Sequence, residues 1–381
     1  MLIKLLHTAD WQIGKQFGQF EADDAALLAD ARFTVVERLA SLATAQGIHA
    51  ILVAGDVFDA QGVNDKTVHR LFNCLAAFKG AWVLIPGNHD AALAESVWTR
   101  AVRMNSVPPN AHLCLTPEPL VLESLGLVLL PAPLTQRHTH SDLTEWFASA
   151  PVPTDLFRVG LAHGSVQGIL ADGIDSSNPI AAGRAEQSGL DYLALGDWHG
   201  TKQVDARTWY SGTPETDRFK ANDSGQALVV VLPERSALPV VTTVATGQYR
   251  WRQDEVDLQV PSDVEALLHR LAGLTVNDVL DMRLSGRSDL AGQRRLLEAI
   301  GQARGRARSL LADLSQLRFE PTTEDIAALK ADGYLGEVVA ELRVAQTSPA
   351  AEAADLARDS LALLAGILDE RRVTSVAGAA L

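Results

Sequence analysis

The first 232 residues alternate between short apolar runs and longer segments with helical spacing. Each run is rich in Val, Leu and Ile and ends at glycine or at a polar residue. This pattern is typical of strands that are buried in a sheet. We predict strands over residues 2–6, 49–56, 81–90, 125–133, 157–164, 191–200 and 227–233.

Two helices are predicted between these strands. Residues 23–47 and 65–80 carry apolar positions at helical spacing, and they close on Gly47 and Gly80. Glycine favours the end of a helix because it adopts the left-handed conformation without strain. The alternation of strand, helix and strand predicts a layered α/β fold in which helices cover a sheet.

The pattern loosens around residues 233–260, and a second region follows. Helices over 264–273 and 293–314 flank a strand over 278–286, which predicts a small α/β unit. Pro321 begins an Ala-rich helical part. The predicted domains are 1–250, 251–320 and 321–381.

The last helical segment, residues 355–372, carries a set of apolar residues at helical spacing. They are Leu356, Leu363, Leu364, Ile367 and Leu368. Two interpretations stay open: this face packs against the body of the protein, or it accepts the helix of a partner.

Composition excludes several classes of protein. With 47% hydrophobic and 21% charged residues, the chain is that of a folded protein rather than a disordered one. No apolar run approaches the roughly 18 residues that a membrane span needs, and no signal peptide is recognisable at the N-terminus. We therefore expect a cytoplasmic protein with no membrane association.

Charge and cysteine content narrow the chemistry further. The net charge of −14 argues against a protein that coats nucleic acid through bulk electrostatics, although a few cations on one face remain compatible with it. Cys74 and Cys114 form no CxxC pair, so neither a disulfide framework nor a thiolate zinc site is indicated.

Polar side chains lie at or just beyond the carboxyl ends of five of the predicted strands, where ligands bind in layered α/β folds. These residues are Asp10 and Gln12, Asp56 and Asp59, Asn88, His89 and Asp90, His163, and Asp197 and His199. Any one of them has an ordinary explanation as a turn residue. Five in series indicate a site for two divalent metal ions, and therefore hydrolysis of a phosphoester.

The ordered set of Asp-x-Gln, GDxxD, GNHD, an isolated His and a final GDxH resembles the calcineurin-like binuclear metallophosphoesterases. Within that superfamily, LHTADWQIG, AGDVFD, PGNHD and WYSGTPETDRF are similar to the SbcD-type DNA-repair nucleases. The resemblance covers roughly the first 250 residues. It implies a β-sandwich core flanked by helices, with a small α/β capping domain and a helical C-terminal tail.

The resemblance also implies a role for each matching residue. Asp56 would bridge two ions, and His89 would face the scissile phosphate to stabilise charge or to protonate the leaving oxygen. The other ligands would divide between Asp10, Gln12 and His199 for one ion and Asn88, His163 and Asp197 for the second. For Asp59 and Asp90 we favour a structural role.

The sequence departs from the family pattern at two ligands, where Gln12 and Asp197 replace histidines. Gln12 still offers an amide oxygen, and Asp197 makes the second site more anionic. Together they shift the preference towards oxygen-loving ions, so Mn²⁺ is favoured, with Mg²⁺ or Fe²⁺ as alternatives. A decayed site is the opposing interpretation, which the intact Asp56, Asn88 and His89 disfavour.

Other motifs carry less weight. His138 and His140 have metal-like spacing, but they lie in a polar loop that follows no carboxylate. The arginines at 294, 295, 304, 306 and 308 are interpreted as a solvated face rather than as phosphate ligands. For Trp11 and Trp198, packing is favoured over stacking on a base.

The sequence thus predicts a metal-dependent phosphodiesterase that acts on DNA. The resemblance implies a homodimer and a large SbcC-like ATPase partner with a coiled coil, gripped by the C-terminal helices. Two alternatives stay open: a phosphodiesterase for a small nucleotide-like substrate, and a non-catalytic adaptor of an ATPase complex.

Overall fold

The computed structural model describes residues 2–168, 177–319 and 333–378, and side chains of the last helix as far as residue 368. The chain forms two compact units, Met1–Arg250 and Trp251–Leu381. Each unit is described by itself. None of the described helices is both long enough and apolar enough to span a membrane.

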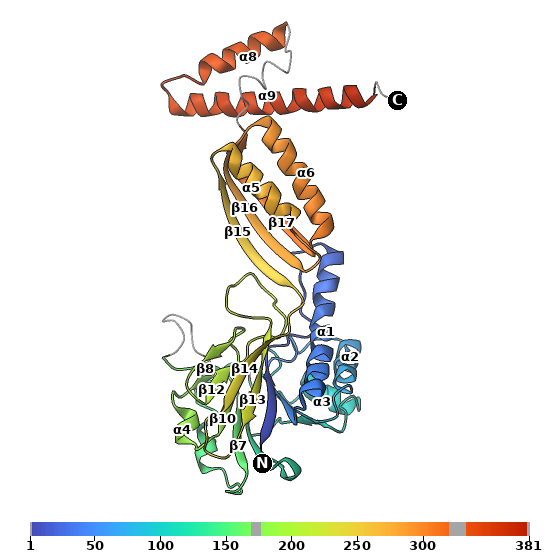
Figure 1. The fold of residues 1–381 in the computed structure, drawn as a ribbon, viewed down its shortest axis with the longest axis vertical. Coiled ribbons are helices and arrows are strands. Elements are labelled where there is room, and N and C mark those ends of the chain that lie inside the picture. Colours follow the sequence, from blue (N-terminus) through green and yellow to red (C-terminus); the bar gives the residue numbers. More distant parts are fainter. Residues whose placement is uncertain (1, 169–176, 320–332, 379–381) are drawn as a thin grey trace. The chain divides into compact units, whose positions relative to one another are not determined.

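The first unit is built on two mixed six-stranded sheets that face each other (Figure 1). The first sheet has the order β14 (Val240–Ala245), β13 (Gln226–Leu232), β1 (Ile3–Thr8), β2 (Ala50–Ala54), β3 (Ala81–Ile85) and β4 (Ala111–Leu113). The second has the order β11 (Lys202–Gln203), β12 (Thr208–Tyr210), β10 (Tyr192–Gly196), β7 (Phe157–His163), β6 (Leu127–Ala132) and β5 (Leu120–Leu122).

Helices cover the outer faces of this sandwich. On the side of the first sheet lie α1 (Ala22–Gln46), α2 (Asp65–Leu75) and α3 (Val97–Arg103), and on the side of the second lies α4 (Arg184–Gln187) (Figure 1). Two 3₁₀ turns, Glu123–Leu125 and Glu145–Ser149, and the short pair β8 (Ser165–Val166) and β9 (Pro179–Ile180) complete the unit. The layered α/β fold that the sequence predicts is confirmed.

The core of the first unit explains the predicted strands. Residues of both sheets, such as Leu52 and Leu161, pack together between them, and a second cluster including Val36 and Trp82 fills the space under the helices. Because β2 and β10 are buried at every position, their sequences are continuous apolar runs. Polar groups on these two strands therefore appear only where the strands end.

The helix boundaries differ in part from the prediction. Helix α1 ends at Gln46 and is capped by Gly47, whose φ of 63° is left-handed, as the sequence predicts. The predicted helix 65–80 is wrong at its end, because α2 stops at Leu75 and Gly80 has no left-handed φ. The peptide N–H of Ala76 turns back to the Asn73 carbonyl instead, which closes the helix one turn earlier.

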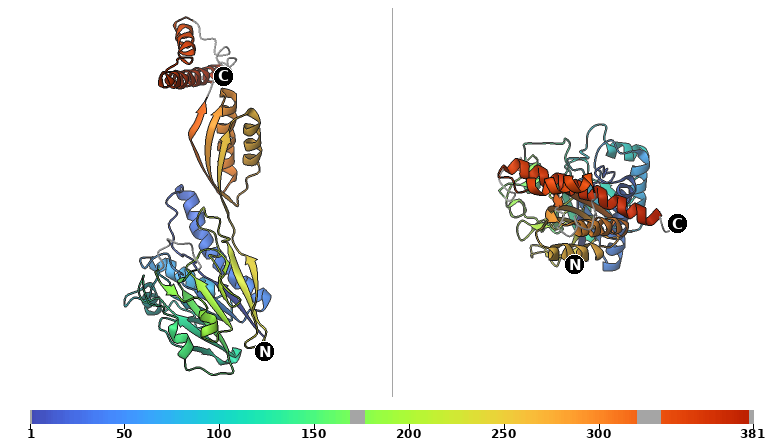
Figure 2. Two further views of the ribbon diagram at one scale, coloured as in Figure 1. Left: turned by 90° about the vertical axis from the view of Figure 1, so that its left-hand side faces the viewer. Right: turned by 90° about the horizontal axis from the view of Figure 1, so that it is seen from above.

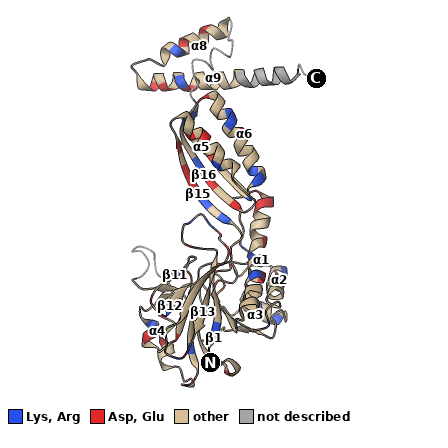
Figure 3. Cartoon of the chain, viewed as in Figure 1, with Lys and Arg blue, Asp and Glu red and all other residues tan. Residues whose placement is uncertain are grey.

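The second unit contains a three-stranded sheet in the order β15 (Arg250–Leu258), β16 (Asp278–Ser288) and β17 (Ser309–Phe319). Helices α5 (Pro261–Ala272) and α6 (Leu290–Arg306) cover one face of this sheet (Figure 2). Charged residues are frequent on β15 and β16, whereas β13 of the first unit carries none (Figure 3). The sheet is therefore apolar on one side only.

One prediction for this region is wrong, and one strand was not predicted. The predicted helix 293–314 ends at Arg306, and Ser309 begins strand β17, which pairs in parallel with β16. The loose segment 233–260 contains strand β15, whose side chains alternate between exposed and partly buried positions. In both cases the neighbouring strand supplies backbone hydrogen bonds that the local sequence does not reveal.

The final helices α8 (Tyr334–Ala345) and α9 (Ala351–Gly378) pack on each other through Val339 and Leu361. The predicted apolar face is divided, because Leu364 joins this contact while Leu363 is 69% exposed. The predicted start of the helical tail, residues 321–332, lies outside the described residues.

Candidate metal centre

The first two loops of the centre follow β1 and β2 and run side by side. The N–H of Gln12 donates to the carbonyl of Asp56 at 3.0 Å, and that of Ile13 donates to Val57 at 2.9 Å. Asp10, Gln12 and Asp56 have φ values of 54°, 50° and 51°, a left-handed region that costs about 1–3 kcal/mol for residues other than glycine. The fold therefore holds these three residues in place against a local preference.

Two glycines let the loops approach closely. A Cβ on Gly87 would lie 2.2 Å from Oδ1 of Asp56, and one on Gly196 would lie 2.0 Å from the carbonyl oxygen of Ala54. No other residue fits at either position without a shift of the backbone. The second sheet thus comes within reach of the strand that carries Asp56.

Three predicted ligands converge here. One ligand atom each from Asp10, Asp56 and His199 lies within 4.8 Å of the others. Asp10 is fully buried, and burial raises the pKa of its carboxyl group to about 6, against the opposing effect of His199 and His163. A buried carboxylate needs a positive partner to stay ionised.

His163 faces the same point from the second sheet. Its Nδ1–H donates to the carbonyl of Ala54 at 2.8 Å, so the lone pair of a neutral ring lies on Nε2. This Nε2 is 3.5 Å from Oδ1 of Asp56 and 3.6 Å from Oδ1 of Asp197. Burial lowers the pKa of His163, but the carboxylates outweigh it and raise the pKa to about 9. A proton and a metal ion would compete for this one lone pair.

The loop after β3 is fixed to Asp56 by its backbone. The N–H of His89 donates to Oδ1 of Asp56 at 2.9 Å, which places Asn88 beside that carboxylate. His89 donates its Nδ1–H to the carbonyl of Asp59 at 2.7 Å, so its Nε2 remains available for chemistry. A pocket of about 240 Å³ adjoins His89 and Asn88 and is also lined by Leu93.

Asp90 has the structural position that the sequence suggests. Its carboxylate accepts the N–H groups of Phe58 and Gly87 at 3.0 and 2.6 Å, and it thereby ties the second ligand loop to the third. Burial, followed by the charge of Asp56, raises its pKa to about 7.

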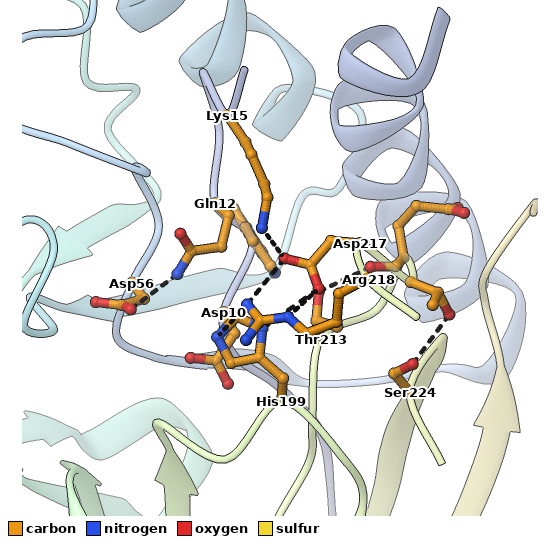
Figure 4. A network of polar contacts seen from close by, with 12 residues as sticks. Asp10, Gln12, Lys15, Asp56, His199, Thr213, Asp217, Arg218 and Ser224 are labelled. Atoms are coloured by element: carbon orange, nitrogen blue, oxygen red, sulfur yellow. Dashed lines mark hydrogen bonds and ion pairs between the residues drawn. The ribbon is translucent and has the colours of Figure 1, made fainter. Parts of the chain in front are cut away.

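Gln12 points its amide nitrogen at Asp56 (Figure 4). Nε2 donates to Oδ2 of Asp56 at 2.8 Å, and the side chain is 1% exposed. In this arrangement Gln12 fixes the carboxylate of Asp56. Ligation of an ion through the amide oxygen would require the amide to turn.

Asp197 and His199 complete the set from the end of β10. The N–H of Asp197 donates to Oδ1 of Asp10 at 3.2 Å, and burial raises the pKa of the Asp197 carboxyl group. Nδ1 of His199 lies 3.6 Å from Oδ1 of the buried Asp217. Burial alone would raise the pKa of Asp217, but His199, Arg32 and Arg218 hold it well below its usual value.

The polar atoms that lack partners show that the site suits a cation. Oδ2 of Asp10, Oδ1 of Asn88 and Nε2 of His163 are buried and accept no hydrogen bond from the described residues. Buried acceptors without a donor are costly, and all three are ligand types that Mn²⁺, Fe²⁺ and Zn²⁺ accept. The residues present therefore fit divalent metal ions.

Four residues around the centre were missed by the sequence analysis as site residues: Lys15, Arg32, Asp217 and Arg218. Arg32 is a fully buried charge within the apolar face of α1, a signal that the helical pattern contains. Asp217 and Arg218 lie in the WYSGTPETDRF segment. Nothing in the local sequence relates Lys15 to them.

The weaker motifs are found where the sequence places them. His138 and His140 are exposed, and the only cluster of three or more His, Cys, Asp or Glu ligands within the described residues is the one at Asp10. Trp11 is fully buried and packs edge-on against Trp82. Arg295 pairs with Glu265 on an exposed helix face of the second unit.

Two facing sheets with carboxylate, imidazole and amide groups at the ends of their strands define a protein that can hold divalent metal ions. The model of the calcineurin-like phosphoesterase family matches residues 3–230, and the chain belongs to this family. Membership indicates a hydrolase that acts on phosphoesters with divalent metal ions.

Curated relatives are similar over parts of the chain. The SbcD subunit of the SbcCD nuclease from Rhodobacter capsulatus is 37% identical over 97 residues, which is 24% of this chain and 22% of that protein. "Uncharacterized metallophosphoesterase YhaO" of Bacillus subtilis is 26% identical over 246 residues, 60% of this chain and 57% of that protein. The chain thus matches less than two thirds of either relative.

A solved structure, that of TT1561 from Thermus thermophilus, is also similar. It has a TM-score of 0.40 and 14% sequence identity, and the match covers 65% of this chain and 100% of that one. This likeness is too low to add to the assignment.

Proposed function

We propose that this protein is a metal-dependent phosphodiesterase that acts on DNA. The observation that carries the proposal is the convergence of Asp10, Asp56 and His199 within 4.8 Å, with buried acceptors of Asp10, Asn88 and His163 left without donors. The metal ligands we propose are Asp10, Gln12, Asp56, Asn88, His163, Asp197 and His199, holding two ions, with Mn²⁺ preferred. Bound divalent ions would lower the pKa of water and neutralise phosphate charge.

The protein's own groups have distinct tasks in this reaction. The N–H of His89 and the amide of Gln12 hold the carboxylate of Asp56, and the carbonyl of Ala54 orients His163 so that its Nε2 faces that carboxylate. His89 keeps one ring nitrogen bound to the Asp59 carbonyl. The other, when protonated, donates a proton to the leaving oxygen or stabilises charge on the phosphoryl group.

DNA as substrate is supported by the local similarity to a nuclease subunit. A small nucleotide-like phosphodiester is the second candidate. The pocket of about 240 Å³ beside His89 favours it, because Leu93 and Arg137 offer an apolar wall and a cation next to the reacting position. An enzyme for DNA would use the same pocket for one nucleotide.

The same similarity supports a further part of the proposal, that the chain is a subunit of a complex with a coiled-coil ATPase. Helix α9 exposes Leu356, Leu363 and Ile367 on one side, a surface on which a partner helix can pack. A homodimer is proposed from the resemblance alone.

The test is Mn²⁺-dependent cleavage of end-labelled single- and double-stranded DNA, with bis(p-nitrophenyl) phosphate as a small diester in parallel. Asp56→Asn should lower both rates by at least about 100-fold and weaken Mn²⁺ binding, measured by calorimetry. The reason is that loss of a metal ligand costs at least as much as loss of a residue that only hydrogen-bonds to a ligand. Asp65→Asn makes the same change on an exposed side chain and should alter neither.

The outcomes separate the candidates. Cleavage of DNA that is lost in Asp56→Asn supports the nuclease. Hydrolysis of the small diester without any cleavage of DNA would favour the second candidate. If the protein binds Mn²⁺ but hydrolyses neither substrate, this result would contradict a stand-alone hydrolase and leave the adaptor as the remaining candidate.

A further inference from the structure

A cluster of cations lies next to His199 around one buried carboxylate (Figure 4). Nζ of Lys15 is 2.5 Å from Oδ2 of Asp217. Arg218 donates from Nε to Oδ1 of Asp217 at 2.9 Å and from Nη2 to Oδ2 at 3.2 Å. Lys15 and Arg218 therefore share one acceptor, and both of its oxygens are occupied.

The exposure of these side chains differs in a way that matters for binding. The side chain of Asp217 is 1% exposed, whereas those of Lys15 and Arg218 are 21% and 44% exposed. The anion is thus enclosed and the cations reach solvent. Lys15, Arg218 and Asp217 together carry a charge of +1 in a chain whose overall charge is −14, and the carboxylates of Asp10 and Asp59 also act on Arg218.

An aromatic side chain with its own cations continues this surface. Trp198 stands between Asp197 and His199 in the chain; it packs against the hydrophobic cluster of the second sheet, as the sequence predicts, and stays partly exposed. Nζ of Lys220 lies 4.6 Å from the centre of its ring, and Nζ of Lys202 lies 5.6 Å away. Lys220 follows Arg218 by two residues, so the WYSGTPETDRF segment continues directly to the cations beside the ring of Trp198.

Cations beside an aromatic face are what a polynucleotide strand requires, since the cations bind its phosphates and the ring stacks with a base. Rigid cations are better than mobile ones, because less side-chain freedom is lost on binding. Asp217 provides that rigidity for Lys15 and Arg218.

We propose that Lys15, Arg218 and Lys220, with the ring of Trp198, bind the phosphates of a polynucleotide strand next to the phosphate that is hydrolysed, and that Asp217 is the residue that positions Lys15 and Arg218. This rests on the proposed function, because it assumes that the substrate is a nucleic acid. It assigns the substrate strand to the His199 side of the metal centre.

The test measures binding of a fluorescein-labelled oligo-dT by the full-length protein over a series of salt concentrations. Lys15→Gln, Arg218→Gln and Lys220→Gln should each lower the slope of log K against log salt by about 0.7, the value for one lost contact with a single strand. Affinity should fall about tenfold for Arg218→Gln, which loses a charged hydrogen bond. Lys79→Gln changes an exposed lysine outside the cluster and should leave slope and affinity unaltered.

Asp217→Asn distinguishes positioning from simple charge. Removal of a negative charge beside the strand would by itself tighten binding, whereas loss of positioning weakens it. We expect weaker binding, with the thermal unfolding midpoint measured to exclude misfolding. Arg218→Lys, which keeps the charge but loses the two-pronged contact, should bind with intermediate affinity.

Kinetics separate this proposal from the function on which it rests. The three cation variants should lose more activity on the oligonucleotide than on bis(p-nitrophenyl) phosphate, mainly through KM. Wild-type affinity and salt slope in all three would overturn the proposal while the nuclease stands. A wild-type protein that hydrolyses the small diester but binds no oligonucleotide would overturn both.

Discussion

The two units bury their sheets in different ways. In the first unit β2 and β10 are buried along their whole length, so polar residues on these strands are confined to the ends. In the second unit β15 alternates along its length between exposed and partly buried residues. The described metal-type cluster lies only in the first unit. In a sheet covered on both faces, polar side chains are found where the strands end, whereas in a sheet covered on one face they occur along the whole length of the strands.

The largest expected effect comes from removing the buried charge of Arg32, which donates hydrogen bonds to the loops at the ends of the strands. Arg32 donates to the carbonyls of Trp11 and Asp10 at 2.7 and 2.9 Å, to the carbonyl of Glu215, and to Oγ1 of Thr213 at 3.0 Å. Arg32→Met leaves four buried acceptors without this donor, at about 1–3 kcal/mol each. We expect the free energy of unfolding of the first unit to fall by at least about 4 kcal/mol, measured by urea denaturation.

Arg103→Met is the control, because the side chains of Arg103 and its partner Glu95 are 65% and 79% exposed, respectively. It should cost less than about 1 kcal/mol. An equal loss in both variants would show that the hydrogen bonds of Arg32 do not support the centre.

A core substitution in the second unit should act on that unit alone. Leu296 and Leu297 are neighbours on α6, the first fully buried and the second 50% exposed. Leu296→Ala should destabilise the second unit by about 3 kcal/mol, and Leu297→Ala by less than about 1 kcal/mol. Hydrogen exchange measured by mass spectrometry would locate the change. Faster exchange in β2 would contradict two independently stable units.

The smallest expected effect concerns pH. His7 is fully buried, with Nε2 3.1 Å from the Leu195 carbonyl and Nδ1 2.9 Å from the Tyr192 hydroxyl. Burial lowers its pKa from 6.5 to about 3, so the folded state holds the ring neutral while the unfolded chain takes up a proton. The contribution of His7 is present above pH 6.5 and is lost as pH falls towards 3. We expect about 2 kcal/mol less stability at pH 5 than at pH 7 from this residue.

His7→Gln should remove that part of the pH dependence, because glutamine does not titrate. The measurement is the free energy of unfolding of both proteins at the two pH values. The same slope in wild type and variant would show that His7 is not the group responsible.

The fold was predictable where burial dictates the pattern. The continuous apolar runs of β2, β3 and β10 mark strands that are covered on both faces, and β1 and β7 are apolar apart from Lys4, His7 and Thr8 and from Arg158 and His163. Strand β15 was not predicted, and the start of β17 was predicted as helix; both strands lie at an edge of their sheet. Their strand conformation depends on pairing with β16, a long-range contact that local spacing does not contain.

The candidate site was predictable in its residue types and not in its contacts. The order of motifs places Asp10, Asp56 and His199 at the ends of strands, and the structure brings these three together. The contact of Gln12 with Asp56 through nitrogen was not foreseen, because the sequence shows an amide but not its direction. Metal binding by these residues, and by Asn88, His163 and Asp197, stays a prediction.

The amino-acid order dictates which residues end the buried strands, since the apolar runs of β2, β3 and β10 leave polar side chains only beyond their ends. What these residues meet depends on tertiary packing. Lys15 and Asp217 are 202 positions apart, and they pair at 2.5 Å because the loops after β1 and β12 reach the same edge. Local propensity extends over a few residues, whereas the charge and burial that give this edge its chemistry arise when distant segments pack together.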